Sequence, residues 1–319
     1  MNRPGRPVVR AYGPDRAQFG ELWLPGITPA ATVVIIHGGF WRARYGVSLG
    51  RPLAADLAHR GYAVWNLEYR RVGAGGGWPA TFEDIAAGID LLCELPVGTA
   101  RVAAIGHSAG GHLAAWAAGR PGLPPGAPGA RPLVTVTAVI SQAGVLALAD
   151  CAREGVGGTA ALDLMGGRPQ DLPQRYRLAD PMTAVPVEAA VLCLHSRADD
   201  AVPFACSERY VAAATRAAGR ARLHETDGDH FTLIDPHSAD WQVAVGALPG
   251  LLGLPAGHLR PGRGETGEDL PASARPSGIS RTPGTAAAEN LRPPHRAGPS
   301  TSQDPSEPTA YTTQHSASS

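Results

Sequence analysis

The chain has 319 residues with no formal net charge, and 44% of its residues are hydrophobic. A chain of this length and composition is large enough to form one sizeable soluble core. All 28 basic residues are arginines, which excludes enzymes that depend on a Schiff-base lysine or on the lysine of a Walker P-loop. Because there is no surplus of positive charge, neither nucleic acid nor a membrane is the expected partner. We therefore expect a small-molecule substrate, and the sequence indicates no oligomeric state.

The cysteines and the N-terminus bear on the cellular compartment. Four cysteines are too few and too scattered for a disulfide framework or a zinc site, so we interpret them as structural side chains. Residues 1–10 contain arginine and proline but no apolar stretch of the kind found in secretory signals, so we expect a cytoplasmic location. The cysteines are Cys93, Cys151, Cys193 and Cys206.

Aromatic residues mark where the folded domain ends. All six tryptophans and all five phenylalanines precede residue 242, whereas residues 255–319 consist mainly of Pro, Ser, Thr, Gly, Arg and Ala. Such a composition buries too little apolar surface to offset the entropy of ordering the chain. We predict one domain over residues 1–254 and a disordered tail over 255–319.

Within residues 8–253, short β-branched apolar runs alternate with Ala- and Leu-rich amphipathic stretches. This alternation predicts an α/β fold with a mostly parallel central sheet flanked by helices. Segment 145–184 interrupts the pattern with glycine and proline, and we expect it to pass over the carboxyl ends of the strands, where such sheets bind ligands. The predicted strands are 17–24, 32–37, 63–67, 102–105, 134–141, 191–195 and 221–225. The predicted helices are 49–60, 82–93, 111–118, 206–219 and 240–252.

A candidate nucleophile lies between a predicted strand and a predicted helix. The sequence there is Gly106-His107-Ser108-Ala109-Gly110. A serine on a sharp turn needs small neighbours two residues away on each side, which the two glycines supply. We predict that Ser108 is a nucleophile; the alternative is a turn in which Ser108 caps the helix.

A serine nucleophile needs a base and an acid that orients the base. Asp199 follows the strand 191–195, and His230 follows the strand 221–225. The order Ser, Asp, His, with separations of 199 − 108 = 91 and 230 − 199 = 31 residues, is typical of α/β-hydrolases. We prefer Asp199 to Asp200 because Val202 and Pro203 can then form the turn. His195, His224 and His237 are the competing histidines, and we interpret the first two as structural.

Backbone donors for an oxyanion are predicted after the strand 32–37. It ends in His37-Gly38-Gly39-Phe40-Trp41, and the two glycines allow backbone N–H groups to turn toward the nucleophile. We predict an oxyanion hole formed by the N–H groups of Gly39, Phe40 and Ala109. We predict no metal site, because no H-x-x-x-H motif, H-E-x-x-H motif or Cys/His cluster accompanies His107 and His112.

These motifs resemble the α/β-hydrolase superfamily, and within it the kynurenine formamidase and small carboxylesterase branch. The resemblance rests on the HGG-aromatic-W and G-H-S-A-G motifs and extends over most of residues 10–253. It implies an α/β-hydrolase fold with a small excursion over the active site and an acyl-enzyme without a cofactor. It also implies cleavage of carboxylic esters or of the N-formyl amide of formylkynurenine. Two departures, Ser196 where glycine is frequent and Asp180 where serine is frequent, lie outside the predicted triad.

The remaining motif residues support or line the site in this hypothesis. We interpret Glu68-Tyr69-Arg70 as a buried brace and predict that Trp41 and Phe231 line the substrate pocket, since each adjoins a residue that must face it. The hypothesis is a serine hydrolase acting on a small ester or aryl formamide. The alternatives are a catalytically silent small-molecule receptor on the same fold and a serine peptidase-like hydrolase.

Overall fold

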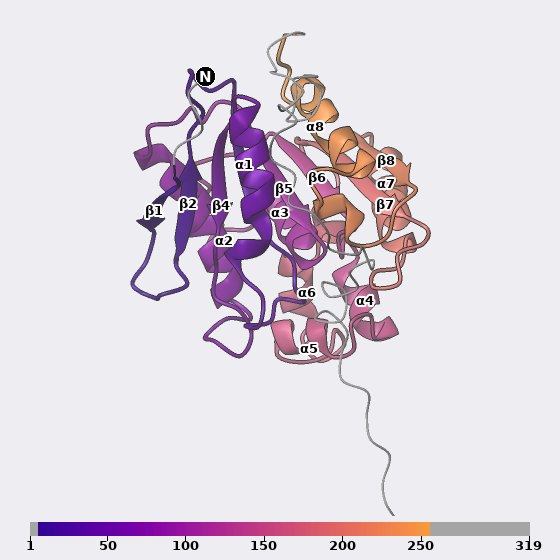
Figure 1. The fold of residues 1–319 in the computed structure, drawn as a ribbon. Helices are drawn as coiled ribbons and strands as arrows, with labels where there is room; N and C mark the ends of the chain where they lie inside the picture. The colour runs from indigo at the N-terminus through magenta and orange to yellow at the C-terminus, as the bar shows by residue number, and fades with distance from the viewer. Residues whose placement is uncertain (1–5, 256–319) are drawn as a thin grey trace, which may run out of the picture. The chain divides into compact units, whose positions relative to one another are not determined.

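An eight-stranded sheet is the centre of residues 6–255, the part of the chain that the computed structural model describes (Figure 1). The strand order is β1-β2-β4-β3-β5-β6-β7-β8. Strands β3 to β8 run parallel, and β2 is antiparallel to both β1 and β4. This confirms the mostly parallel sheet predicted from the alternation. The strands are β1 (Val8–Ala11), β2 (Phe19–Trp23), β3 (Thr32–Ile36), β4 (Ala63–Leu67), β5 (Val102–His107), β6 (Ala138–Gln142), β7 (Ala190–Ser196) and β8 (Ala221–Thr226).

Helices cover both faces of the sheet and divide the core into two clusters. On one face, α1 and α8 pack on Val33 and Ile35 of β3. On the other face, α2, α3 and α7 pack with Val34 and Ile36. Every residue of β3 is buried, as expected for a β-branched strand covered on both faces. The helices are α1 (Arg51–His59), α2 (Ala80–Asp90), α3 (Ala109–Gly119), α4 (Leu148–Glu154), α5 (Ala160–Met165), α6 (Pro173–Ala179), α7 (Ala205–Arg216) and α8 (Ala239–Leu251), with 3-10 turns at Val47–Gly50, Leu91–Glu94, Arg120–Gly122, Pro181–Ala184 and Thr232–Ile234.

Two strands differ from the prediction. Strand β1 was not predicted, and all four of its residues are exposed, so an edge strand of this kind carries no burial pattern in the sequence. The strand predicted over 134–141 begins only at Ala138. Val134 and Val136 are buried without belonging to a strand. Apolar content therefore predicted their burial correctly and their backbone conformation wrongly.

Segment 145–184, called the covering segment below, contains three helices, α4, α5 and α6, that were not predicted. Gly155 and Gly166 end α4 and α5 in the left-handed conformation, with φ of 72° and 77°, so these glycines are helix C-caps. The segment lies at the carboxyl ends of the strands: Arg42, after β3, donates to Asp163 (3.0 Å), and Trp78 N–H donates to the carbonyl oxygen of Leu164 (2.7 Å). Figure 1 shows the three helices gathered at one end of the sheet.

The N-terminal hairpin, β1 and β2, is fastened to the sheet by side chains as well as by strand pairing. The Tyr12 hydroxyl donates to the carbonyl oxygen of Glu68 (2.7 Å), and Gln18 Nε2 donates to Asp84 (2.7 Å). Glu68 directly follows β4 and Asp84 lies in α2, so the hairpin is attached both to the end of that strand and to a helix.

Two remaining features concern the limits of the fold. Among residues 6–255, no helix is long and apolar enough to cross a membrane. The tail predicted over 255–319 lies outside the described residues, apart from Pro255.

Candidate active site

Ser108 stands on the turn between β5 and α3 in a strained backbone conformation. Its φ is 55° and its ψ is −118°, a region that residues with a side chain rarely adopt. Its N–H donates to the carbonyl oxygen of Gln142 at the end of β6 (2.8 Å). A strained serine between a strand and a helix is the geometry of a nucleophile elbow.

Glycines make this turn possible. A Cβ atom on Gly106 would lie 2.1 Å from the carbonyl oxygen of Gly110, and one on Gly110 would lie 2.0 Å from the carbonyl oxygen of Ile36. Both obstacles are backbone atoms, which cannot rotate away. The strand, turn and helix therefore close only when these two positions carry hydrogen, which is the physical reason for the G-x-S-x-G spacing.

His230 and Asp199 meet at this end of the sheet. His230 Nδ1 lies 2.6 Å from Asp199 Oδ2. The other carboxylate oxygen, Oδ1, accepts the N–H groups of Ala201 and Val202 (2.9 and 2.8 Å). The Asp199 side chain is fully buried, whereas Asp200 is exposed. The structure thus brings Asp199, and not Asp200, to His230.

His195 is a second histidine on the same carboxylate, a contact that the sequence did not predict. Its Nε2 lies 3.3 Å from Asp199 Oδ2 and 2.9 Å from the carbonyl oxygen of Val202. Burial raises the pKa of Asp199, but the hydrogen bonds from His195, His230 and the Val202 N–H outweigh it and hold the pKa well below its usual range. The carboxylate is therefore charged and fixed in orientation.

His107, directly before Ser108, holds the loop that carries His230. Its Nε2 lies 2.8 Å from the carbonyl oxygen of His230, so Nε2–H is the donor. The two imidazole rings lie 4.5 Å apart between centroids. Burial, together with the charge of His230, lowers the pKa of His107 to about 3, so this ring stays neutral near pH 7.

His107 brings the base next to the residue that precedes the nucleophile. Ser108 and His230 are both buried, at 4% and 3% exposure. Within residues 6–255, Ser108 Oγ makes no hydrogen bond with His230. Catalytic hydrogen bonds are often long before substrate binds and tighten in the complex. The missing hydrogen bond is therefore compatible with His230 acting as the base for Ser108.

The segment after β3 approaches Ser108 closely. A Cβ atom on Gly38 would lie 2.7 Å from the carbonyl oxygen of His107 and 3.3 Å from Ser108 Cβ. Gly39, Phe40 and Trp41 follow with φ of 109°, 56° and 56°. No acceptor in the described chain takes the N–H of Gly39 or Phe40.

Ala109 supplies a third free donor. As the first residue of α3 it has no carbonyl one turn earlier in the helix. The structure therefore leaves the N–H groups of all three predicted oxyanion residues without a partner in residues 6–255.

Glu68 holds the segment after β3 in place through hydrogen bonds of its carboxylate. One carboxylate oxygen accepts from His37 Nε2 and from Tyr69 N–H (2.9 Å each), and the other accepts from Val47 N–H (2.9 Å). Arg71 forms an ion pair with the same carboxylate. Burial opposes the charge, but these partners, His37 foremost, lower the pKa of Glu68. The buried brace predicted for the Glu68-Tyr69-Arg70 motif is thus present around Glu68.

The two predicted pocket residues differ in position. Phe231 is partly exposed, and its ring centroid lies 5.1 Å from that of His230. Trp41 is 2% exposed and packs edge-on against His112, with a centroid distance of 5.3 Å. Its indole N–H has no partner within the described residues. Burial does not exclude Trp41 from the substrate pocket, since Ser108 is also buried. The role of Trp41 in binding stays a prediction.

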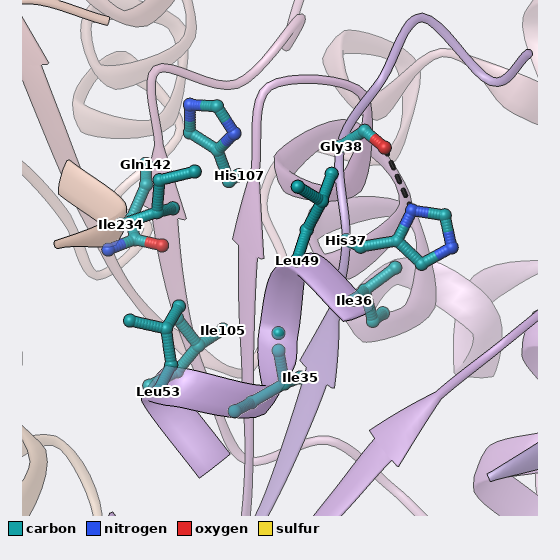
Figure 2. A pocket seen from close by; sticks show the side chains of 11 residues that line it. Ile35, Ile36, His37, Gly38, Leu49, Leu53, Ile105, His107, Gln142 and Ile234 are labelled. Atoms are coloured by element: carbon teal, nitrogen blue, oxygen red, sulfur yellow. Dashed lines mark hydrogen bonds between the residues drawn. The ribbon is translucent and has the colours of Figure 1, made fainter. Parts of the chain in front are cut away.

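A small, partly open pocket lies beside the ends of β3 and β5 (Figure 2). Its volume is about 10 Å³, which is room for about one water molecule, and Gly38 and His107 contribute to its wall. His37 Nδ1 lies 2.8 Å from the carbonyl oxygen of Gly38 beside it. The pocket is too small for an ester. In the described part of the chain, no cluster of His, Cys, Asp and Glu could hold a metal ion.

The family model described as BD-FAE matches residues 25–213, and no curated protein matches the chain. A truncated carbohydrate esterase from gut microbiota superposes with a TM-score of 0.66 at 21% identity, over 79% of this chain and 98% of that one. A butyrate-bound thermophilic esterase from Thermogutta terrifontis superposes with a TM-score of 0.64 at 20% identity, over 80% and 96%.

The same Thermogutta terrifontis esterase 2 has also been solved phosphonylated by sarin. That structure superposes with a TM-score of 0.63 at 20% identity, over 82% of this chain and 98% of that one. Together these similarities show that the chain has the α/β-hydrolase fold.

Proposed function

We propose that this chain, which belongs to the BD-FAE family, is a serine hydrolase that cleaves small carboxylic esters through an acyl-enzyme on Ser108. The observation that carries the proposal is the 2.6 Å contact between His230 Nδ1 and Asp199 Oδ2, placed beside a strained serine on a strand–helix turn. The structures of similar fold support an ester as the substrate, because they are described as esterases.

In the first half of the proposed reaction, Ser108 Oγ attacks the carbonyl carbon of the ester. His230 Nε2 accepts the serine proton, while Asp199 keeps the other ring nitrogen protonated and stabilises the imidazolium that forms. The negative charge on the carbonyl oxygen is met by the N–H groups of Gly39, Phe40 and Ala109. The imidazolium then donates its proton to the departing alcohol, which leaves an acyl group on Ser108.

In the second half, a water molecule takes the place of the alcohol. His230 accepts a proton from the water as its oxygen attacks the acyl carbon, and the same donors stabilise the second oxyanion. The bond to Ser108 Oγ breaks, the proton returns to the serine, and the carboxylic acid leaves. No cofactor takes part in this scheme.

The closed surroundings of Ser108 favour a small acyl group. Ser108 is 4% exposed, and the covering segment reaches the oxyanion residues, because a Cβ atom on Gly157 would lie 2.7 Å from the Phe40 ring. Acetyl, butyryl and formyl groups are all small. For this reason we keep an aryl formamide, such as N-formylkynurenine, as a second candidate substrate. A cytoplasmic location stays a prediction from the N-terminal residues.

A covalent label and three substrates test the proposal. Paraoxon should transfer its diethylphosphoryl group to Ser108 Oγ with loss of 4-nitrophenolate, and mass spectrometry should find no label on Ser108→Ala. Ser48→Ala, which removes an exposed serine, is the matched control and should be labelled like the wild type. Hydrolysis of p-nitrophenyl acetate, p-nitrophenyl butyrate and N-formylkynurenine should fall at least about 10³-fold in Ser108→Ala. A label elsewhere, or equal rates in the wild type and Ser108→Ala, would overturn the proposal.

The substrates also distinguish the two candidates. A preference for N-formylkynurenine in the wild type indicates an aryl formamidase, whereas fast cleavage of only the two nitrophenyl esters indicates an esterase.

A further inference from the structure

Two buried cysteines from distant parts of the chain touch each other. Cys151 lies in α4 of the covering segment, and Cys206 lies in the first turn of α7. Their sulfur atoms are 3.0 Å apart, and the residues are 1% and 0% exposed. Even two carbon atoms in ordinary contact stand about 3.5–4.0 Å apart, and sulfur is larger than carbon. The pair is therefore closer than packing alone produces.

Ion pairs hold the two helices in this register. Arg209, three residues after Cys206, donates to Asp150 (3.2 Å) and to Glu154 (2.9 Å) on α4. These contacts flank Cys151 on both sides along its helix. Three separate side-chain contacts, one between the sulfur atoms and two from Arg209, therefore fix the same alignment of α4 and α7.

The two thiols differ in character. The hydrogen bond shared with Cys151, helped by the charge of Arg209 and opposed by burial, lowers the pKa of Cys206. The same hydrogen bond, together with burial, raises the pKa of Cys151. The charge of Arg209 acts on Cys206 and favours its thiolate, and the thiolate is the reactive form of cysteine.

We propose that Cys151 and Cys206 are an oxidative modification site that forms a disulfide with a hydroperoxide as the oxidant. The Cys206 thiolate attacks one peroxide oxygen, the O–O bond breaks, and hydroxide leaves as Cys206 becomes a sulfenic acid. Cys151 sulfur then attacks the Cys206 sulfur, the S–O bond breaks, and the Cys151 proton leaves with the hydroxyl group as water. With hydrogen peroxide, two thiols and one peroxide give one disulfide and two water molecules. Hydrogen peroxide is small and uncharged, which suits a buried pair.

The bond would join the covering segment to the loop that carries Asp199. Cys206 N–H donates to the carbonyl oxygen of Pro203 (2.9 Å), directly after the Val202 N–H that holds the Asp199 carboxylate. The two cysteines enclose a loop of 206 − 151 = 55 residues, which contains most of the covering segment. A cross-link here restricts this part of the chain in the unfolded state.

The full-length protein allows a direct test, because trypsin, which cleaves after arginine except where proline follows, places every cysteine in its own peptide. Arg120 and Arg131 are each followed by proline and stay uncut. Cys93 falls in residues 72–101, Cys151 in 102–153, Cys193 in 178–197 and Cys206 in 198–209. After treatment with hydrogen peroxide, we expect peptides 102–153 and 198–209 to be joined, at a mass about 2 Da below their sum. Denatured protein should expose two free thiols instead of four, and dithiothreitol should restore all four. The wild type alone suffices for this measurement.

Variants and stability complete the test, and no readout depends on hydrolysis. Cys93→Ala, which removes the exposed cysteine, should keep the cross-link, whereas Cys206→Ala should lose it. The oxidised wild type should melt roughly 5–10 °C above the reduced wild type, and Cys206→Ala should show no such rise. Four free thiols after oxidation, a cross-link between other peptides, or an equal rise in Cys206→Ala would overturn the proposal. If Cys206→Ala does not fold, the oxidised and reduced wild types still decide it.

Discussion

His112 should make the protein less stable in weak acid, by an amount that the structure allows to be calculated. His112 is completely buried in the first turn of α3. Its Nε2–H donates to the carbonyl oxygen of Ala179 (2.9 Å), and Nδ1 has no partner within residues 6–255. Burial, only partly offset by the bond to Ala179, lowers the pKa of His112 to about 4. In the unfolded chain the ordinary histidine pKa of about 6.5 applies.

The sign follows from which state binds the proton. Between pH 6.5 and pH 4 the unfolded chain protonates this histidine and the folded chain does not, so acid favours unfolding. Each pH unit in this window costs about 1.4 kcal/mol, which gives a loss of about 2 kcal/mol at pH 5. His107, with its pKa of about 3, adds a second loss of about 2 kcal/mol at pH 5. The lowered pKa values of Asp199 and Glu68 act only below pH 5, because carboxylates remain charged in both states above it.

Urea unfolding at pH 8, 7, 6 and 5, followed by tryptophan fluorescence, measures this loss. The wild type should lose about 4 kcal/mol of unfolding free energy between pH 8 and pH 5 from the two histidines. His112→Gln is the informative variant, because glutamine can still donate to Ala179 but does not titrate. Its loss should be about 2 kcal/mol smaller than that of the wild type. Equal losses in both proteins would refute the reasoning, since His112 would then titrate as it does in water.

Three further outcomes test other parts of the structure. Asp199→Asn should lower kcat for p-nitrophenyl acetate by roughly 10⁴-fold with little change in KM, and a loss below tenfold would contradict its role in orienting His230. Glu68→Gln should lower the unfolding free energy by about 3 kcal/mol in urea, because it leaves Arg71 without its buried partner; an unchanged midpoint would argue against the brace. Gly110→Ala should yield no soluble folded protein, judged by circular dichroism, whereas Gly98→Ala, where a Cβ atom meets nothing within 4 Å, should fold normally.

The sequence predicted those features that depend on local pattern. The run of β-branched residues in β3 and the Gly106 to Gly110 turn have steric requirements that can be recognised in one short segment. Residues at the carboxyl ends of parallel strands share one edge of the sheet, which is why the sequence alone predicts that Asp199 and His230 lie near Ser108.

The features that escaped prediction depend on distant contacts. His195 ends a predicted strand, which favours a structural role, and nothing near it in the sequence indicates that its ring returns to Asp199. The contact between Cys151 and Cys206 depends on how the covering segment folds back over α7. That segment was rich in glycine, and only the structure shows that Gly155 and Gly166 terminate helices.

The N-terminal hairpin sets a lower limit on how far the chain can be shortened. Through Tyr12 it holds the carbonyl group of Glu68, and the side chain of the same residue supports His37 next to the oxyanion segment. A fragment cut to residues 25–213, the part that the family model covers, would lose this support at one end and His230 with α8 at the other. The boundaries of sequence similarity are therefore narrower than the unit that can fold and act, and trimming for crystallisation or expression should begin after α8 and spare the first strands.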